Sequence, residues 1–218
     1  MVVARTKLVN HVRGTVKSLG ACLPKCTAQS FHHKVAEQLP PELALALGPI
    51  VETIASLSER IREYDRRLEE VVDELYPETG LLRQVHRVGA RTALAFVLTL
   101  EDPSRFAKSR QVGPYLGLVP SIDQSGGSDP QRRISKHGNE LTRKLLVNCA
   151  HCVLGPFGED CDLRRHGEKI AGRGGKNAKK RAVVAVARKL SVLLHCLRVT
   201  AEVYEPLYNA SRQECQTA

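Results

Sequence analysis

Residues 43–75 read LALALGPIVETIASLSERIREYDRRLEEVVDEL, and this stretch carries the clearest periodicity of the chain. Apolar side chains recur at alternating spacings of four and three residues, which is the a/d pattern of a heptad repeat. Because a strict repeat of this kind is narrower than the apolar stripe of an ordinary globular helix, we predict a coiled-coil arm over residues 41–78. The arm would form a homo-oligomer through residues 50–75. The seam consists of Leu43, Leu47, Ile50, Ile54, Leu57, Ile61, Tyr64, Leu68, Val71 and Leu75.

Proline residues bound this helix on both sides. Gly48-Pro49 interrupts the early part of the pattern, and proline is well tolerated as a first helical residue, so we predict that the regular helix begins at Pro49. Tyr76-Pro77 ends it. One alternative stays open, which is a long amphipathic helix packed within its own chain.

Charge is distributed unevenly over the 218 residues, which carry a formal net charge of +10. Counting Lys and Arg as positive and Asp and Glu as negative gives a net charge of −6 for residues 41–80, +6 for 81–150 and +9 for 161–199. A basic half beside an acidic segment predicts a nucleic-acid-binding face and a separate assembly element. Seven cysteines without a signal peptide are typical of free thiols in the cytoplasm, and no apolar run is long enough to span a membrane.

The stretch GLVPSIDQSGGSDPQRRISKHGN, residues 117–139, combines a serine, a Gly-Gly pair and a basic run. Glycines allow a close approach of the backbone to a ligand, so the loop could expose the hydroxyl of Ser125. Arginines offer forked donors that match a phosphate. A nucleophile acting on a nucleic-acid phosphate needs such neighbours, and a solvated turn is the alternative. The basic residues here are Arg132, Arg133, Lys136 and His137. Gly138-Asn139 then marks the entry to a helix, on which we predict Arg143 on the polar side, opposite the apolar residues.

Several blocks of the chain occur in an order that resembles a known family. RVGARTALAF at 87–96, DPSRFAKSRQVGPYLGLVPSIDQSGG at 102–127 and RRISKHGNELTRKLL at 132–146 resemble the C-terminal domain of the insertion-sequence transposases related to Piv DNA invertases. The resemblance covers residues 81–204, and RTKLVNHVRGTVKSLGACLP at 5–24 is similar to the end of the first domain of that family.

The resemblance implies a role for each part of the chain. Ser125 matches the serine before Gly-Gly that attacks DNA in the family. Residues 1–40 would be the end of an RNase-H-like domain whose acidic residues hold Mg²⁺, yet these forty residues contain one carboxylate, Glu37. We therefore expect an N-terminally truncated copy with no cofactor of its own. Residues 79–204 would be the transposase domain and 205–218 a disordered tail. DNA is the implied partner, and a guide RNA is the second.

Two further stretches predict contact with nucleic-acid phosphates. LLRQVHRVGARTALAFVLTL, at 81–100, resembles a helix-hairpin-helix, in which backbone N–H groups at a short turn face a phosphate. The usual Pro-Gly-hydrophobic-Gly pattern is incomplete, because His86 and Arg87 occupy its first two positions and only Gly89 matches its last. A second basic loop leads into a helix whose first turns carry Lys179, Lys180 and Arg181.

Cysteine spacing raises the question of a metal site. Cys149, Cys152, Cys161 and His166 follow a Cys-x2-Cys and Cys-x4-His pattern. Because the first pair falls on a predicted helix, buried thiols are favoured over zinc. The sequence thus predicts a mainly α protein, with a coiled-coil arm and a compact helical domain, that takes part in DNA transposition. The alternative function is a catalytically inactive module for nucleic-acid binding and oligomerisation.

Overall fold

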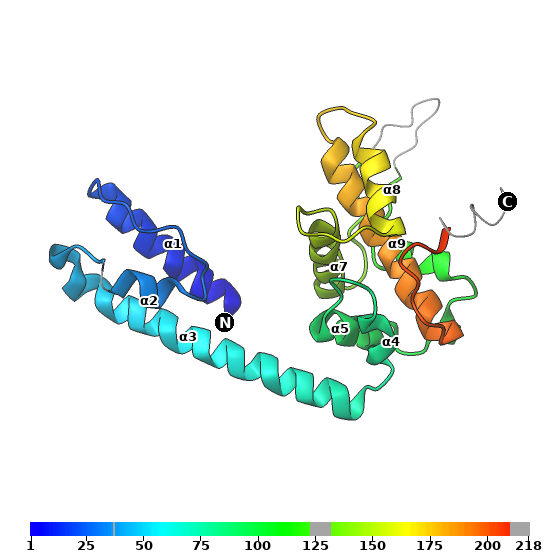
Figure 1. Cartoon of the computed structure of the whole chain (residues 1–218), viewed down its shortest axis with the longest axis horizontal. Coiled ribbons are helices and arrows are strands. Elements are labelled where there is room, and N and C mark those ends of the chain that lie inside the picture. Colours follow the sequence, from blue (N-terminus) through cyan, green and yellow to red (C-terminus); the bar gives the residue numbers. More distant parts are fainter. Residues whose placement is uncertain (37, 123–131, 210–218) are drawn as a thin grey trace. The chain divides into compact units, whose positions relative to one another are not determined.

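The computed structural model describes residues 1–36, 38–122 and 132–209, which are helical over most of their length (Figure 1). Within these ranges the one extended pairing is an isolated antiparallel bridge between Pro120 and Ile134. The predicted mainly α class is therefore confirmed. The chain divides into two compact units, Met1–Glu70 and Val71–Ala218. A search of the described helices finds none with the length and apolar character that crossing a membrane requires.

In the first unit, two shorter helices pack against one long helix. Helix α1 spans Val2–Ser18, α2 spans Phe31–Ala36 and α3 spans Pro41–Leu75. Each helix contributes apolar residues at helical spacing to one shared core, which removes their apolar surface from water. Figure 1 shows α1 and α2 beside the first part of α3. The core consists of Val9, Val12, Val16, Phe31, Val35, Leu47, Val51 and Ile54.

Helix α3 begins earlier than predicted. It starts at Pro41 and contains Pro49 in its interior, so the prediction that the regular helix begins at Pro49 is wrong. A proline inside a helix removes one backbone N–H and leaves the carbonyl four residues earlier unpaired. That carbonyl belongs to Leu45, whose residue is 91% exposed, so water can hydrate it. Tertiary packing of Leu47 and Val51 in the core then offsets the remaining cost.

The apolar seam of α3 has two different environments along its length. Its first part, including Leu47 and Ile54, is buried within the chain against α1 and α2. This is the internal packing that the sequence left open as an alternative. Its second part, residues 64–75, remains largely exposed, with Tyr64 at 56% and Leu75 at 67% of full exposure. Self-association through residues 50–75 stays a prediction, and the residues available for it lie in the second part.

The second unit is organised around its longest helix, α9, at Ala178–Thr200. Helices α4, α6, α7 and α8 all pack against α9. Their shared core includes Phe96 of α5, Leu146 of α7 and Val186, Leu190 and Leu194 of α9. The shorter helices are α4 at Thr79–Arg83, α5 at Ala90–Leu100, α6 at Val112–Tyr115, α7 at Glu140–Val153 and α8 at Asp162–Ala171.

A buried histidine attaches the segment between α5 and α6 to α9. His195 is 1% exposed, its Nδ1 lies 2.9 Å from the hydroxyl of Ser109, and its Nε2 lies 3.1 Å from the carbonyl oxygen of Pro103. A carbonyl can only accept, so Nε2 donates to Pro103 and Nδ1 accepts from Ser109. The two short 3₁₀ turns at Pro103–Arg105 and Ser109–Gln111 are thereby held in place.

Candidate nucleic-acid interface

The loop predicted to carry the nucleophile has a closed base. Pro120 and Ile134 form an antiparallel bridge. Two hydrogen bonds flank it: the amide of Ser121 donates to the carbonyl of Arg133 at 2.8 Å. The amide of Ser135 donates to the carbonyl of Val119, also at 2.8 Å. The two ends of the loop therefore lie side by side, as in a hairpin. Ser125 lies in residues 123–131, outside the described residues, so its role stays a prediction.

Two glycines make the close chain crossing beneath this base possible. Gly117 has a φ of +67° and Gly138 a φ of +76°, in the left-handed region that favours glycine. A Cβ atom added to Gly117 would lie within 3.0 Å of the backbone of His137, and one added to Gly138 would lie within 3.0 Å of the carbonyl oxygen of Tyr115. The amide of Lys136 donates to the carbonyl of Gly117 at 3.2 Å. Backbone contact thus fixes where the basic segment begins.

Arg143 supports the same crossing from below. The sequence predicts it on the polar side of its helix, but this prediction is wrong, because Arg143 is only 8% exposed. Its Nη1 donates to the carbonyl oxygens of Leu116 at 3.2 Å, His137 at 2.8 Å and Gly138 at 3.5 Å. Buried carbonyls need donors, and a guanidinium supplies several in a fixed plane. Arg143 therefore joins both sides of the crossing.

The structure brings four of the predicted phosphate-binding residues together on the return side of the loop. Arg132, Arg133, Lys136 and His137 are all exposed and lie immediately before α7. Asn139 ends this segment as the cap of α7, because its side-chain oxygen accepts from the amide of Thr142 at 3.0 Å. This helix start was indicated by Gly138-Asn139 in the sequence. The contact of these four residues with phosphate stays a prediction.

The turn between α4 and α5 lies elsewhere in the unit and holds Arg87 and Gly89. Arg87 has a φ of +72°, so it adopts the left-handed conformation at the position where the helix-hairpin-helix pattern has a glycine. Its guanidinium donates to the carbonyl of Phe157, and its own carbonyl accepts from Cys149 Sγ at 3.1 Å. Arg87 is thus engaged within the chain. Phosphate contact at this turn, and the helix-hairpin-helix itself, stay predictions.

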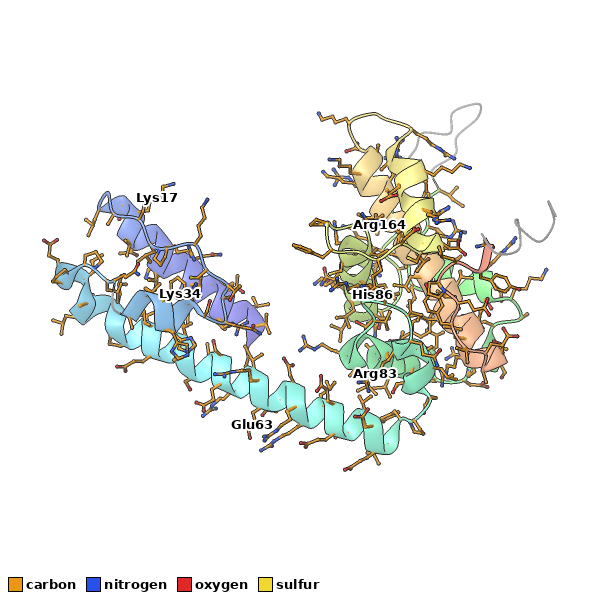
Figure 2. All side chains as sticks on the ribbon, in the orientation of Figure 1. Lys17, Lys34, Glu63, Arg83, His86 and Arg164 are labelled. Carbon is orange, nitrogen blue, oxygen red and sulfur yellow. The ribbon has the colours of Figure 1, made fainter. Side chains whose placement is uncertain are left out.

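A cleft of about 550 Å³ opens beside this turn, between the turn, the α7–α8 loop and the segment after α9. His86 Nδ1 lies 3.2 Å from a carboxylate oxygen of Glu159, while His86 Nε2 is buried without a hydrogen-bond partner among the described residues. Arg164 holds the α7–α8 loop by donating to the carbonyls of Val153, Gly155 and Gly158. Figure 2 labels His86 and Arg164. The lining of the cleft combines the carboxylates of Glu159 and Asp160 with the cations Arg83 and Arg87.

Lys179, Lys180 and Arg181 are exposed at the first turns of α9, next to the loop from α8. Arg181 donates from Nη2 to the carbonyl of Gly174 at 3.3 Å. The first turn of α9 contains no acidic residue, and cations in a first turn oppose the positive end of the helix dipole. Further along the helix, Arg188 packs over Gly113 of α6, where a Cβ atom would lie 3.0 Å from its Cγ.

The cysteine pattern does not form a metal site in the described part of the chain. No group of three or more His, Cys, Asp or Glu side chains there could hold a metal ion, so these residues fit neither zinc nor Mg²⁺. Cys149 and Cys161 are buried, while Cys152 is exposed. Burial raises the pKa of the Cys149 thiol. Cys161 Sγ accepts from the amide of Arg164 and so caps α8.

Sequence reasoning missed two groups of residues at this interface. Arg143 was placed on the wrong side of its helix. The sequence also did not indicate that Lys169 and Arg173 lie near Lys189. Burial is the largest cause of the lowered pKa of His166, and the charges of these three residues lower it further. The spacing of residues 166 and 169 places them on one helical face, which was the available signal, and Arg173 follows in the loop after α8. Their proximity to α9 required the tertiary structure.

Comparisons with known proteins show what the central part of the chain is similar to. Residues 79–160 match the family model described as Transposase IS116/IS110/IS902 family. The chain is 28% identical over 212 residues to the transposase for insertion sequence element IS1111A of Coxiella burnetii, covering 94% of this chain and 57% of the relative. It is 25% identical over 213 residues to a probable family 20 transposase of Pseudomonas aeruginosa, covering 94% and 62%.

A third relative is the transposase for insertion sequence element IS1328 of Yersinia enterocolitica, which is 28% identical over 157 residues, or 71% of this chain and 47% of the relative. The chain thus spans about half the length of the curated relatives it matches. The family match includes the loop base, Arg143 and the basic return segment described above. Residues 79–160 are therefore similar to transposases of the IS116/IS110/IS902 family.

Proposed function

We propose that this chain acts in DNA transposition, as the part of a transposase that binds DNA and supplies Ser125 as the nucleophile for strand cleavage and exchange. The observation that carries the proposal is the family match over residues 79–160, which includes Ser125 and the four exposed basic residues after it. The paired loop base at Pro120 and Ile134 supports it, because a nucleophile must be held near its substrate.

The proposed chemistry is a transesterification at a DNA phosphate. The Oγ atom of Ser125 attacks phosphorus, a P–Oγ bond forms, and the P–O bond to the neighbouring nucleotide breaks. The serine proton passes to a base, for which His137 is the candidate in this chain, and the leaving oxygen takes up a proton. Arg132, Arg133 and Lys136 stabilise the negative charge on the phosphoryl oxygens. Mg²⁺ and its acidic ligands, as the resemblance implies them, would come from outside these residues.

The first test concerns binding to duplex DNA without strong sequence preference. Each phosphate neutralised by a cation contributes about −0.9 to the slope of log affinity against log salt. Changing Lys179, Lys180 and Arg181 to alanine should weaken binding to all sequences and flatten the slope by about 2.7. Fluorescence anisotropy with labelled duplexes between 50 and 300 mM salt measures this, and a labelled RNA hairpin tests the proposed guide RNA as a second partner.

A matched control removes the same charge from the first unit. Lys7, Lys17 and Lys34 are exposed there, and their change to alanine should alter the slope much less. Equal flattening by both triple variants would mean that only net charge matters, and it would remove the start of α9 from the proposed interface.

We also propose that the exposed second part of the α3 seam joins two copies of this chain. The support is the heptad spacing together with the large exposed fraction of Tyr64 and Leu75. Mixed charges flank the seam and form i,i+4 ion pairs, such as Arg67 with Glu63 and Arg66 with Glu70. This face carries few charges of its own, as a helix–helix contact requires.

Light scattering tests the assembly. Wild type should be at least dimeric, and Tyr64→Asp combined with Leu75→Asp should give a monomer with unchanged helix content, because both side chains are exposed. The comparison variant is Ile54→Asp, which places a carboxylate in the core of the first unit, where Ile54 is fully buried. It should unfold that unit, at a cost of about 3 kcal/mol or more. A monomeric wild type would contradict the proposal.

A further inference from the structure

The hairpin of α8 and α9 has an unusually close contact near its middle. Gly167 of α8 is buried, and a Cβ atom there would lie within 3.0 Å of side-chain atoms of Leu154 and Val186. The absence of a side chain lets α8 lie directly on α9. His166, the preceding residue, is consequently brought beside Lys189 on the neighbouring helix.

Three cations surround His166 from three different elements. Burial is the largest cause of the lowered pKa of His166, and the charges of Lys189 on α9, Arg173 in the loop and Lys169 on α8 lower it further. All three cations are exposed. They belong to the segment with the highest positive charge in the sequence, residues 161–199.

Several other cations of the same unit have acidic partners. Arg164 pairs with Glu168, Arg165 with Asp160 and Lys144 with Glu140. Neither Lys169, Arg173 nor Lys189 lies within 4.0 Å of a carboxylate oxygen in the parts of the chain that the structure describes. Like charges at this proximity repel one another. An external anion that binds among these three cations would reduce their mutual repulsion.

The length of the cluster indicates a polymer of phosphates. Arg181 and Lys189 lie two i,i+4 steps apart on α9, or roughly 12 Å at a rise of 1.5 Å per residue. His166 and Lys169 lie roughly 5 Å apart along α8 by the same measure, and Arg173 follows in the loop after α8 ends at Ala171. One phosphate cannot contact cations distributed over that length, whereas successive phosphates of one strand rise about 3.4 Å each along a duplex.

The composition of the hairpin indicates a duplex. Residues 158–198 contain no Phe, Tyr or Trp, so no aromatic side chain is present on which an unpaired base could stack. On the hairpin itself, residues 162–200, the exposed large apolar side chain is Val199 near the end of α9, so the hairpin lacks the broad apolar face that insertion into a membrane requires. Backbone phosphates remain as the chemical group that this surface can recognise. Figure 2 shows nitrogen-ended side chains around the α8–α9 loop.

We infer that the side of the α8–α9 hairpin formed by Lys169, Arg173, Arg181 and Lys189, with His166 at its centre, binds the backbone phosphates of a nucleic-acid duplex. We call this surface the hairpin phosphate row. It rests on the proposed binding of nucleic acid and extends the surface at the start of α9, which already includes Arg181, along the α8–α9 hairpin. The row reads no base sequence, and its role is to position the duplex.

The test compares two triple variants with equal loss of charge in the full chain. The first changes Lys169, Arg173 and Lys189 to glutamine. The control changes Arg105, Lys144 and Arg165 to glutamine, each of which is paired with a carboxylate. With duplex DNA, the first variant should flatten the salt slope by about 2.7 and lower affinity at 0.1 M salt by on the order of a hundredfold. The control should retain most of the wild-type slope.

A second readout reports on the location of the contact. Phosphates beside His166 favour its protonated form, so its pKa should rise when duplex is bound, and affinity should increase as pH falls through the interval between the free and bound pKa values. NMR titration of the His166 ring measures this shift. Parallel titrations with duplex DNA, a duplex RNA hairpin and single-stranded DNA distinguish the sources of phosphate, and single strands should bind most weakly.

The outcomes separate this inference from the proposed function. A wild-type chain that binds no nucleic acid overturns both. A chain that binds duplex, with an unchanged slope in the Lys169/Arg173/Lys189 variant and an unchanged pKa of His166, overturns the hairpin phosphate row alone. Tighter binding of single strands than of duplex would also contradict it. Circular dichroism of each variant confirms that helix content is retained.

Discussion

Ser125→Ala is expected to abolish any covalent protein–DNA species that this chain can form, while DNA affinity stays within a small factor of wild type. The nucleophile is the atom that forms the new bond, so its loss should lower the rate by on the order of 10⁴-fold or more. One hydroxyl contributes little to binding that is dominated by phosphate contacts. The assay supplies labelled DNA together with the acidic domain of a related transposase and its guide RNA, and denaturing electrophoresis detects the shifted band.

Two controls accompany this experiment. Ser128→Ala removes the nearest other serine hydroxyl of the same loop and should leave the band intact. The 218 residues alone, with magnesium, should give no band, because a serine hydroxyl is a poor nucleophile without an effective base or metal. A band that persists in Ser125→Ala would show that another residue is the nucleophile. If no combination gives a band, the inactive nucleic-acid-binding module becomes the better description.

Gly117→Ala is expected to be the most damaging small substitution near the loop base. Its φ of +67° disfavours any side chain, by roughly 1–2 kcal/mol. The added methyl would also lie within 3.0 Å of the backbone of His137, and forcing it into a packed region costs roughly 1–3 kcal/mol more. The free energy of unfolding of the second unit should therefore fall by about 2–5 kcal/mol. Urea unfolding followed by circular dichroism measures this loss.

Gly80→Ala is the matched control for this substitution. Gly80 lies in α4, and no heavy atom lies within 4 Å of an added Cβ. Alanine should be neutral there or stabilise the helix by roughly 0.5–1 kcal/mol. Amide hydrogen exchange gives a local readout, because Lys136 and Ser135 donate across the loop base. Faster exchange at these amides in Gly117→Ala alone would support the argument, and equal stability of both variants would contradict it.

Local pattern was sufficient to predict several elements of the fold. The apolar period of residues 43–75 predicted a long helix, and α3 covers that range. Asn139 was correctly placed at a helix start, since its capping hydrogen bond joins residues only three apart. The mainly α class followed from the same 3.6-residue and 3.5-residue periods. These features depend on interactions between near neighbours in the chain, which sequence spacing reports directly.

The start of α3 shows where local rules fail. Proline is favoured in a first turn, so Pro49 was taken as the beginning, yet the helix continues back to Pro41. A proline in the interior of a helix costs about 3 kcal/mol. Burial of Leu47 and Val51 against α1 and α2 outweighs this cost. The same packing decides which half of the apolar seam is buried. A heptad repeat indicates a partner helix without saying whether it belongs to the same chain.

For the candidate interface, too, the sequence determined some features and the tertiary structure determined others. Composition alone determined that the second half of the chain is strongly basic, and the helical period alone determined the helices on which those charges lie. Only the tertiary structure decided that Arg143 is buried and donates to three carbonyls, and that Lys189 of α9 lies near enough to His166 to act on it together with Lys169 and Arg173. The physical reason is that burial and electrostatic proximity depend on distances between residues far apart in sequence, and close helix packing at Gly167 sets those distances.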